Sequence, residues 1–166
     1  RDFESRQVSD AILERELPTL HLEDVSAIPF VDGVAGVEQY QHRARVRAQD
    51  GDLFASTSMP APGYEAYCRD RLAMGSVEHV LAAPIPGAPT QVARACMAGE
   101  AFEQLCRVAA AHDGLMLHPY MGIEAVWELA AKIEASAQAP VFVHGPTPDA
   151  LWLANDKARL TELALE

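Results

Sequence analysis

The sequence predicts an α/β fold, a Rossmann-like three-layer α/β/α domain with a mostly parallel sheet. From residue 51 onward, short apolar segments of strand length alternate with longer amphipathic segments of helical period. Residues 140–144 include three contiguous apolar residues, which is typical of a strand buried on both faces. Prolines and glycines separate the segments, and 166 residues are enough for one domain with a core.

The alternating elements follow one another along residues 51–166, after a turn signal at Asp50 and Gly51. The expected strands are residues 52–56, 77–83, 115–118 and 140–144. The expected helices are residues 64–72, 90–111 with a break at Gly99, 122–135 and 149–165. The helix at 122–135 carries the clearest apolar stripe, formed by Ile123, Val126, Trp127, Ala130 and Ile133.

Residues 1–50 are expected to form an N-terminal extension to this domain. Ser9 and Asp10 can cap a helical turn that ends before Pro18. Residues 20–50 show no clean hydrophobic period, so we expect an irregular or strand-containing segment there. Within it, Arg43, Arg45 and Arg47 alternate as residues on one face of a strand do, and the simplest interpretation is a solvated strand face.

Composition excludes several classes of partner. The formal net charge is −11, from 13 Lys and Arg against 24 Asp and Glu, which disfavours binding to nucleic acid or to anionic membranes. No apolar run approaches the roughly 18 residues of a membrane-spanning helix. Cys68, Cys96 and Cys106 form no CxxC pair, which indicates reduced and mostly buried thiols. We therefore expect a cytoplasmic protein with no nucleic-acid or membrane partner.

Sequence motifs for self-contained chemistry are missing. The chain has no GxGxxG, no GxxxxGK[ST], no GxSxG and no HExxH, so a complete dinucleotide, P-loop, hydrolase or zinc-protease site is not expected. His118 and His144 end two expected strands, and their rings would approach each other if the strands are neighbours. No third metal ligand can be nominated, so we assign neither a metal site nor a catalytic residue.

The last 27 residues contain a strand, a Gly-Pro turn, a short helix and then Asn155-Asp156-Lys157, which opens another helix. Asn155 or Asp156 can cap that helix. A lysine near a helix N-terminus opposes the helix dipole. The simpler interpretation is a solvated lysine, and the alternative is a cation that meets an anion such as a phosphate.

This run resembles the junction between the N-terminal domain and the ATP-binding body of ATP-grasp enzymes. The strand–helix series before it resembles their pre-ATP-grasp domain, so residues 50–166 look like the N-terminal part of a carboxylate–amine ligase or a biotin carboxylase-like protein. The matching residues are Gly145, Pro146, Asn155, Asp156 and Lys157, followed by Leu160 and Leu163. The resemblance divides the chain into the extension at 1–50, a Rossmann-like pre-ATP-grasp domain at 51–148 and the start of linker helices at 149–166.

The resemblance implies ATP and Mg as cofactors, with Lys157 contacting the nucleotide phosphates. A small-molecule carboxylate would be activated as an acylphosphate and attacked by an amine or a similar nucleophile. The ATP-grasp body would lie in the rest of the polypeptide, beyond Glu166, so we expect the chain alone to be inactive and to bind Mg-ATP more weakly than millimolar. A homodimer is left open.

Ligands of parallel α/β sheets bind beyond the carboxyl ends of the strands. The loops at 56–62, 83–89 and 119–122 are therefore expected to form part of the substrate pocket, with Thr57 and Tyr120 as substrate contacts. Two alternatives stay open. One is a free-standing Rossmann-like module that binds a small molecule at these loops without catalysis. The other is an oligomerisation domain that exposes Trp127, Trp152 or Tyr64 as interface anchors.

Overall fold

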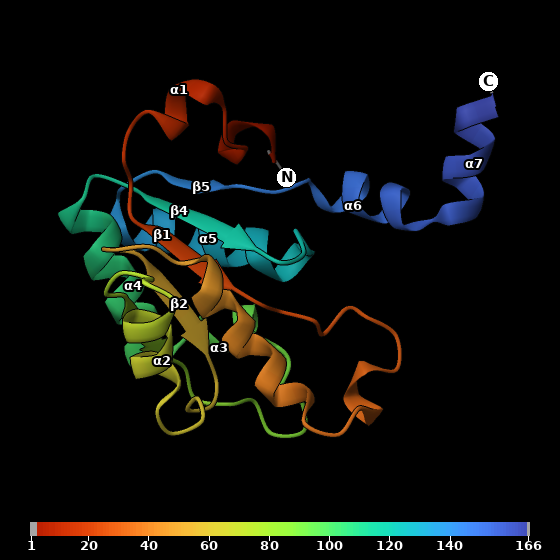
Figure 1. Cartoon of the computed structure of the whole chain (residues 1–166). Coiled ribbons are helices and arrows are strands. Elements are labelled where there is room, and N and C mark those ends of the chain that lie inside the picture. The colour runs from red at the N-terminus through yellow and green to blue at the C-terminus, as the bar shows by residue number, and fades with distance from the viewer. Residues whose placement is uncertain (1–2, 166) are drawn as a thin grey trace.

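A single parallel sheet of five strands organises the protein. The computed structural model describes residues 3–165, apart from the side chains of residues 4 and 32. The sheet has the order β3-β2-β1-β4-β5, and every strand pair is parallel (Figure 1). Its strands are β1 Thr19–Leu22, β2 Leu53–Ser56, β3 Glu78–Leu81, β4 Leu115–Pro119 and β5 Val141–Val143. The expected Rossmann-like α/β architecture is confirmed.

Helices connect and cover the strands. The α-helices are α1 Asp10–Leu13, α2 Tyr64–Arg71, α3 Val92–Ala95, α4 Gly99–Ala111, α5 Glu124–Ala137, α6 Pro148–Asn155 and α7 Lys157–Leu165. Three 3-10 segments are η1 Glu4–Arg6, η2 Val31–Gly33 and η3 Val37–Arg47. Gly99 breaks the long helical stretch as expected, because α4 begins at this residue with a positive φ of 64°. None of the helices among residues 3–165 is long and apolar enough to cross a bilayer.

The main core lies between the sheet and the helices α3, α4 and α5. Leu20 and Leu22 of β1 and Leu117 of β4 are fully buried on this face of the sheet. The apolar stripe of α5 meets them with Val126, Leu129, Ala130 and Ile133, each without exposed surface. Helical spacing on α5 and two-residue spacing on the strands therefore produce one continuous apolar layer.

The central strand, β1, lies in the segment whose period the sequence did not reveal. It pairs with β2 on one side and β4 on the other. Because β1 has four residues and alternates leucine with Thr19 and His21, its apolar pattern is too short to distinguish a strand. The expected boundary at residue 51 falls between β1 and β2, two paired strands of the same sheet.

The second face of the sheet is covered by η3, which packs on β1 and β2. The expectation that Arg43, Arg45 and Arg47 line a solvated strand face is wrong, because all three belong to this 3-10 segment. Arg45 has no exposed surface. In a tighter helix, adjacent alternate residues point in different directions, so Arg45 takes other partners than Arg43 and Arg47 do.

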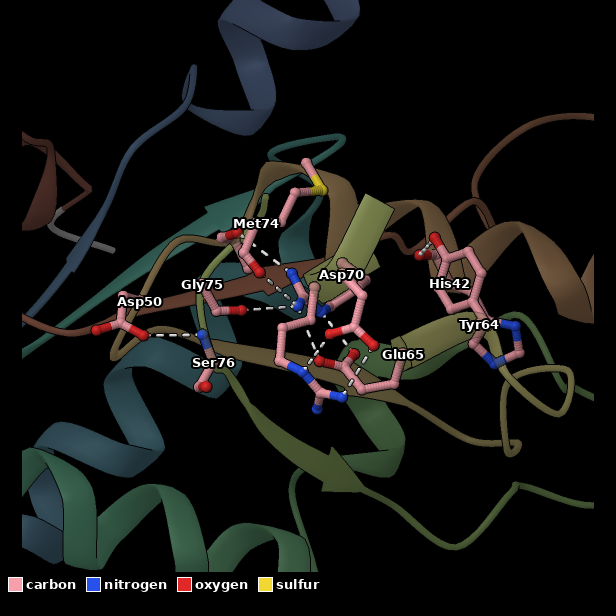
Figure 2. A network of polar contacts seen from close by, with 11 residues as sticks. His42, Asp50, Tyr64, Glu65, Asp70, Met74, Gly75 and Ser76 are labelled. Atoms are coloured by element: carbon pink, nitrogen blue, oxygen red, sulfur yellow. Dashed lines mark hydrogen bonds and ion pairs between the residues drawn. The ribbon is translucent and has the colours of Figure 1, made fainter. Parts of the chain in front are cut away.

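Arg45 fastens η3 to α2 and to the loop before β3. Its guanidinium donates to both carboxylate oxygens of Glu65 at 2.7 and 2.8 Å. It also donates to the carbonyl of Gly75 at 2.9 Å and, at 3.3 Å, to that of Met74. Figure 2 shows Glu65, Met74 and Gly75 gathered in this network, with the Tyr64 hydroxyl donating to the carbonyl of His42 beside it. The network sets the position of η3, which also carries Arg43 and Arg47.

The C-terminal helices form an arm that extends away from the sheet (Figure 1). Helix α6 is held to the body by Leu151, which is buried, and by the Trp152 indole, which donates to Glu124 at 3.2 Å. Helix α7 has no buried residue, and Leu160 and Leu163 on it are about half exposed, at 47% and 48%. The arm therefore presents apolar and charged groups to its surroundings.

Candidate functional site

The topology places a crevice between β1 and β4. The chain runs from β1 through β2 to β3 on one side of the sheet, then returns to place β4 and β5 on the other side. At such a reversal the connections leave the carboxyl ends of two neighbouring strands in opposite directions, and ligands bind in the gap between them. The residues directly after β1 and β4, beginning with Glu23 and Tyr120, lie at this point.

Glu23 is a carboxylate held beneath the surface at the end of β1. Its residue is 4% exposed, yet two cations face it. Arg43 forms an ion pair with one carboxylate oxygen, and Arg47 approaches the other at 3.4 Å. Both arginines come from η3, four residues apart. A buried carboxylate needs such partners, because its desolvation would otherwise cost several kcal/mol.

Arg47 closes the gap between the two strand ends. It donates to the carbonyl of Leu22 at 3.1 Å and to that of Pro119 at 3.4 Å, which are the last residues of β1 and β4. Burial lowers the pKa of Arg47, while the Glu23 carboxylate acts in the opposite direction. A guanidinium keeps its proton in proteins. Arg47 is therefore a fixed positive charge at the centre of the crevice.

Arg43 stands at the mouth of the crevice. Its guanidinium carbon lies 4.6 Å from the centre of the Tyr40 ring and 5.5 Å from that of Tyr120. The Arg43 side chain is 51% exposed. The amide of Tyr120 donates to the carbonyl of Leu22 at 2.9 Å, which fixes the start of the loop after β4. We call Glu23, Arg43, Arg47, Tyr40 and Tyr120 the switch-point cluster.

A row of rings crosses the second face of the sheet beside this cluster. The rings of His21 and His118 have centroids 5.1 Å apart, and those of His118 and His144 are 4.9 Å apart. The expected approach of His118 and His144 is thus confirmed. His21 is held by a contact of 3.0 Å between its Nε2 and Asp52. Burial lowers the pKa of His118 to about 4, and the neighbouring His21 and Arg47 act in the same direction.

His118 is a neutral group at neutral pH. A histidine with a pKa near 4 carries no charge at pH 7, so His118 adds hydrogen-bonding capacity to the crevice without adding charge. The stacked rings do not converge on one point. Among the side chains that the structure describes, no group of three or more His, Cys, Asp or Glu is placed to hold a metal ion.

Thr57, expected as a substrate contact, is held by the protein itself. Its hydroxyl lies 3.1 Å from the Gln41 side-chain oxygen and 3.1 Å from the carbonyl of Pro89, so its single hydrogen is already taken. The residue is 7% exposed. It borders an open cavity of about 490 Å³ at the ends of β2 and β3, beside Gly99 and Glu100. Its contact with a substrate stays a prediction.

Tyr120, the other expected contact, belongs to the switch-point cluster and is 51% exposed. Thr57 follows β2 and Tyr120 follows β4, and β1 lies between these strands. The structure therefore places the two residues in different parts of the carboxyl edge. Tyr120 is the one whose ring lies against an arginine, Arg43.

Lys157 is the first residue of α7 and is exposed. The residue before it, Asp156, lines an open groove of about 420 Å³ together with Trp152 from the arm and Ile28 and Met121 from the loops after β1 and β4. The arm therefore leaves the body at the same edge as the crevice. The contact of Lys157 with a nucleotide stays a prediction.

Sequence reasoning missed Glu23, Arg43 and Arg47. One signal was available, since Arg43 and Arg47 are four residues apart and so share a face of an α-helix. The alternation of three arginines suggested a strand instead. Nothing in the sequence pattern marked Glu23 as a site residue. Its position at the site depends on β1, and the hydrophobic pattern did not identify that strand.

Comparison with known proteins identifies the family. The family described as Pre ATP-grasp domain matches residues 41–135, more than half of the chain. The chain belongs to the Pre ATP-grasp domain family. The matched region runs from the middle of η3 to the last turns of α5, and so includes β2, β3 and β4. No curated protein and no solved structure matches this chain.

Membership confirms that the strand–helix series resembles a pre-ATP-grasp domain, and the resemblance of the run after residue 139 stays a prediction. This pre-ATP-grasp chain is the N-terminal type of domain of an ATP-grasp protein. Arg43, Arg47 and Tyr120 all lie inside the matched region, whereas Lys157 lies outside it. The oligomerisation alternative loses one expected anchor, because Trp127 is 3% exposed and donates to the carbonyl of Gly122. Trp152 remains partly exposed, at 39%.

Proposed function

We propose that this chain is the N-terminal domain of an ATP-grasp ligase that uses ATP and Mg to activate a carboxylate for attack by an amine. The observation that carries the proposal is the Pre ATP-grasp match over residues 41–135, on a parallel sheet whose switch point holds two arginines. The acyl phosphate forms when the carboxylate oxygen attacks the γ-phosphorus of ATP and ADP leaves. The amine then displaces phosphate from the acyl carbon.

In this proposal Lys157 contributes positive charge to the nucleotide phosphates. Phosphoryl transfer is catalysed mainly by positioning and by cations that stabilise the charge on the transferred group. Two features support the assignment of Lys157. It opens the exposed helix of an arm that projects from the body, and it directly follows a residue that lines the groove at the carboxyl edge.

The test uses the ATP-grasp enzyme that carries this chain. Carboxylate-dependent ADP release is measured, and hydroxylamine is added to trap the acyl phosphate as a hydroxamate. We expect Lys157→Gln to lower kcat/KM for ATP about 100-fold, the lower end of the range found for single charge-stabilising groups. Arg159→Gln is the matched control, because Arg159 is also exposed and lies two residues along the same helix. It should leave kcat/KM unchanged.

Two results would contradict the proposal. Carboxylate-dependent ATP cleavage with no hydroxamate would exclude an acyl phosphate. Equal losses for Lys157→Gln and Arg159→Gln would assign the effect to the helix as a whole and remove the specific role of Lys157.

A further inference from the structure

The Arg43 guanidinium has hydrogen-bond donors that can still take an acceptor. Its guanidinium lies against the rings of Tyr40 and Tyr120, and its Nη2 forms the ion pair with Glu23. Among the side chains that the structure describes, no hydrogen-bond acceptor of the protein is bound to its Nε or Nη1. A guanidinium presents its donors in a planar fork that matches a carboxylate. The free donors of Arg43 can therefore receive an oxyanion from solution.

The charge balance at the switch point also favours an anion. Two guanidinium groups, Arg43 and Arg47, face the single carboxylate of Glu23, so one positive charge is left over among these three groups. Glu23 is 4% exposed and already engaged on both oxygens. In the part of the chain that the structure describes, no second carboxylate forms an ion pair with Arg43. The excess charge lies on the half-exposed Arg43, where a ligand can reach it.

The apolar groove begins at the next residue along the chain. Tyr120 stacks on Arg43, and Met121, which follows it, lines the groove with Ile28 and Trp152. Asp156 lines the same groove from the arm. A ligand with both an anionic and an apolar part would be oriented by this arrangement, because Asp156 repels the anion and Arg43 attracts it.

We propose that the switch-point cluster is a substrate subsite, in which Arg43 binds the carboxylate of a small molecule whose apolar or aromatic side chain lies in the groove of Ile28, Met121 and Trp152. The proposal rests on the proposed ligase function for calling this ligand a substrate. The recognition itself requires no ATP and can be measured separately.

The binding experiment uses the 166-residue chain and 3-phenylpropionate as the probe, followed by NMR. Three comparison ligands isolate each part of the probe: 3-phenylpropionamide lacks the charge, acetate lacks the side chain, and inorganic phosphate replaces the planar anion with a tetrahedral one. We expect 3-phenylpropionate to bind at least tenfold more tightly than any of the three and to shift the Trp152 indole signal. The buried Trp127 indole gives an internal reference.

Variants identify the residue that binds the anion. Arg43→Gln should weaken 3-phenylpropionate binding at least tenfold and leave the weak binding of the amide unchanged. Arg43→Lys keeps the charge but loses the planar fork, and should weaken binding by a smaller factor. Arg71→Gln is the matched control, since Arg71 is an exposed arginine at the end of α2 and should bind the probe as the unaltered chain does. Arg43→Lys also keeps the test available if Arg43→Gln fails to fold.

The outcomes separate the subsite from the ligase proposal. Equal affinity for phosphate and 3-phenylpropionate, or loss of binding in Arg71→Gln as large as in Arg43→Gln, would overturn the subsite. So would a probe that causes no shift at Trp152. Failure of the hydroxamate assay alone would mean that the ligand is not a ligase substrate, but the carboxylate-binding site would remain supported. Failure of the binding assay alone would overturn the subsite and leave the ligase proposal unaffected.

Discussion

Arg45 provides the sharpest test of how the switch-point cluster is built, because it lies between Arg43 and Arg47 in η3 and fixes that segment. Replacing it by methionine keeps an apolar stem of similar length but removes every donor. The change breaks the paired contact with Glu65 and leaves the carbonyls of Gly75 and Met74 without this donor.

The magnitude follows from the two halves of the network. The Glu65 side chain is 41% exposed, so water screens the ion pair and its loss costs about 1 kcal/mol. A hydrogen bond from a charged donor to the carbonyl of Gly75 contributes about 2 kcal/mol. The free energy of unfolding should therefore fall by about 3 kcal/mol. For a chain of this size that lowers Tm by about 6–12 °C.

The assay is thermal unfolding followed by circular dichroism. Glu65→Gln keeps a hydrogen-bonding side chain and should cost about 1 kcal/mol, a third of the Arg45→Met effect. Arg69→Met removes an exposed ion pair between Arg69, whose side chain is 52% exposed, and Asp70, whose side chain is 58% exposed. This control should leave Tm unchanged. If Arg45→Met unfolds within 1 °C of the unaltered chain, the network does not hold η3 and the reasoning is refuted.

Two further predictions concern the strand ends. Burial lowers the pKa of His118 from 6.5 to about 4. Between these two pH values the unfolded chain binds more protons than the folded chain. The free energy of unfolding is therefore highest above pH 6.5 and falls as the pH decreases to about 4. This decrease in the free energy of unfolding should be about 1–2 kcal/mol after allowance for solvent screening. Urea titrations at pH 7 and pH 4.5 measure it, and His118→Gln should make the difference between the two pH values smaller. An NMR titration midpoint of His118 near 6.5 would contradict the lowered pKa. Gly122→Ala should lower the free energy of unfolding by about 2 kcal/mol, because a Cβ there would overlap the carbonyl oxygen of Pro146. Gly33→Ala is the control, because a Cβ at that position meets open space. Equal Tm values for the two variants would show that the loops after β4 and β5 do not pack this closely.

The sequence was informative where elements are long or uniformly apolar. Helix α5 was predictable because its stripe repeats over four turns, and β5 because Val141, Phe142 and Val143 are contiguous. The order of these elements then predicted a parallel sheet and brought His118 and His144 together. The arrangement follows from local pattern and a general rule of topology.

The parts that the sequence did not reveal depend on contacts between distant segments. β1 has only two apolar residues on its core face, so its central place is determined by pairing with β2 and β4 and not by local preference. The burial of Arg45 depends on carbonyls about 30 residues away. A charged residue taken alone predicts a surface position, and only the assembled fold shows that a carboxylate and two carbonyls surround Arg45.

The switch-point cluster shows the same limit. Tyr120 could be nominated from its place after an expected strand, whereas Glu23 required the knowledge that β1 ends beside β4. Whether Tyr120 and Thr57 contact a substrate stays a prediction. The structure distinguishes them by their surroundings, because the Thr57 hydroxyl is engaged by Gln41 and Pro89 while Tyr120 borders an exposed cation.

The nucleotide product formed by the ATP-grasp enzyme that carries this chain tests the central claim most directly. Phosphorus NMR of a reaction with Mg-ATP, a panel of small carboxylates and an amine separates ADP and phosphate from AMP and pyrophosphate. Activation through an acyl phosphate predicts ADP and phosphate in equal amounts, formed only when a carboxylate is present. AMP and pyrophosphate, or ATP consumption that is the same with and without carboxylate, would contradict the account.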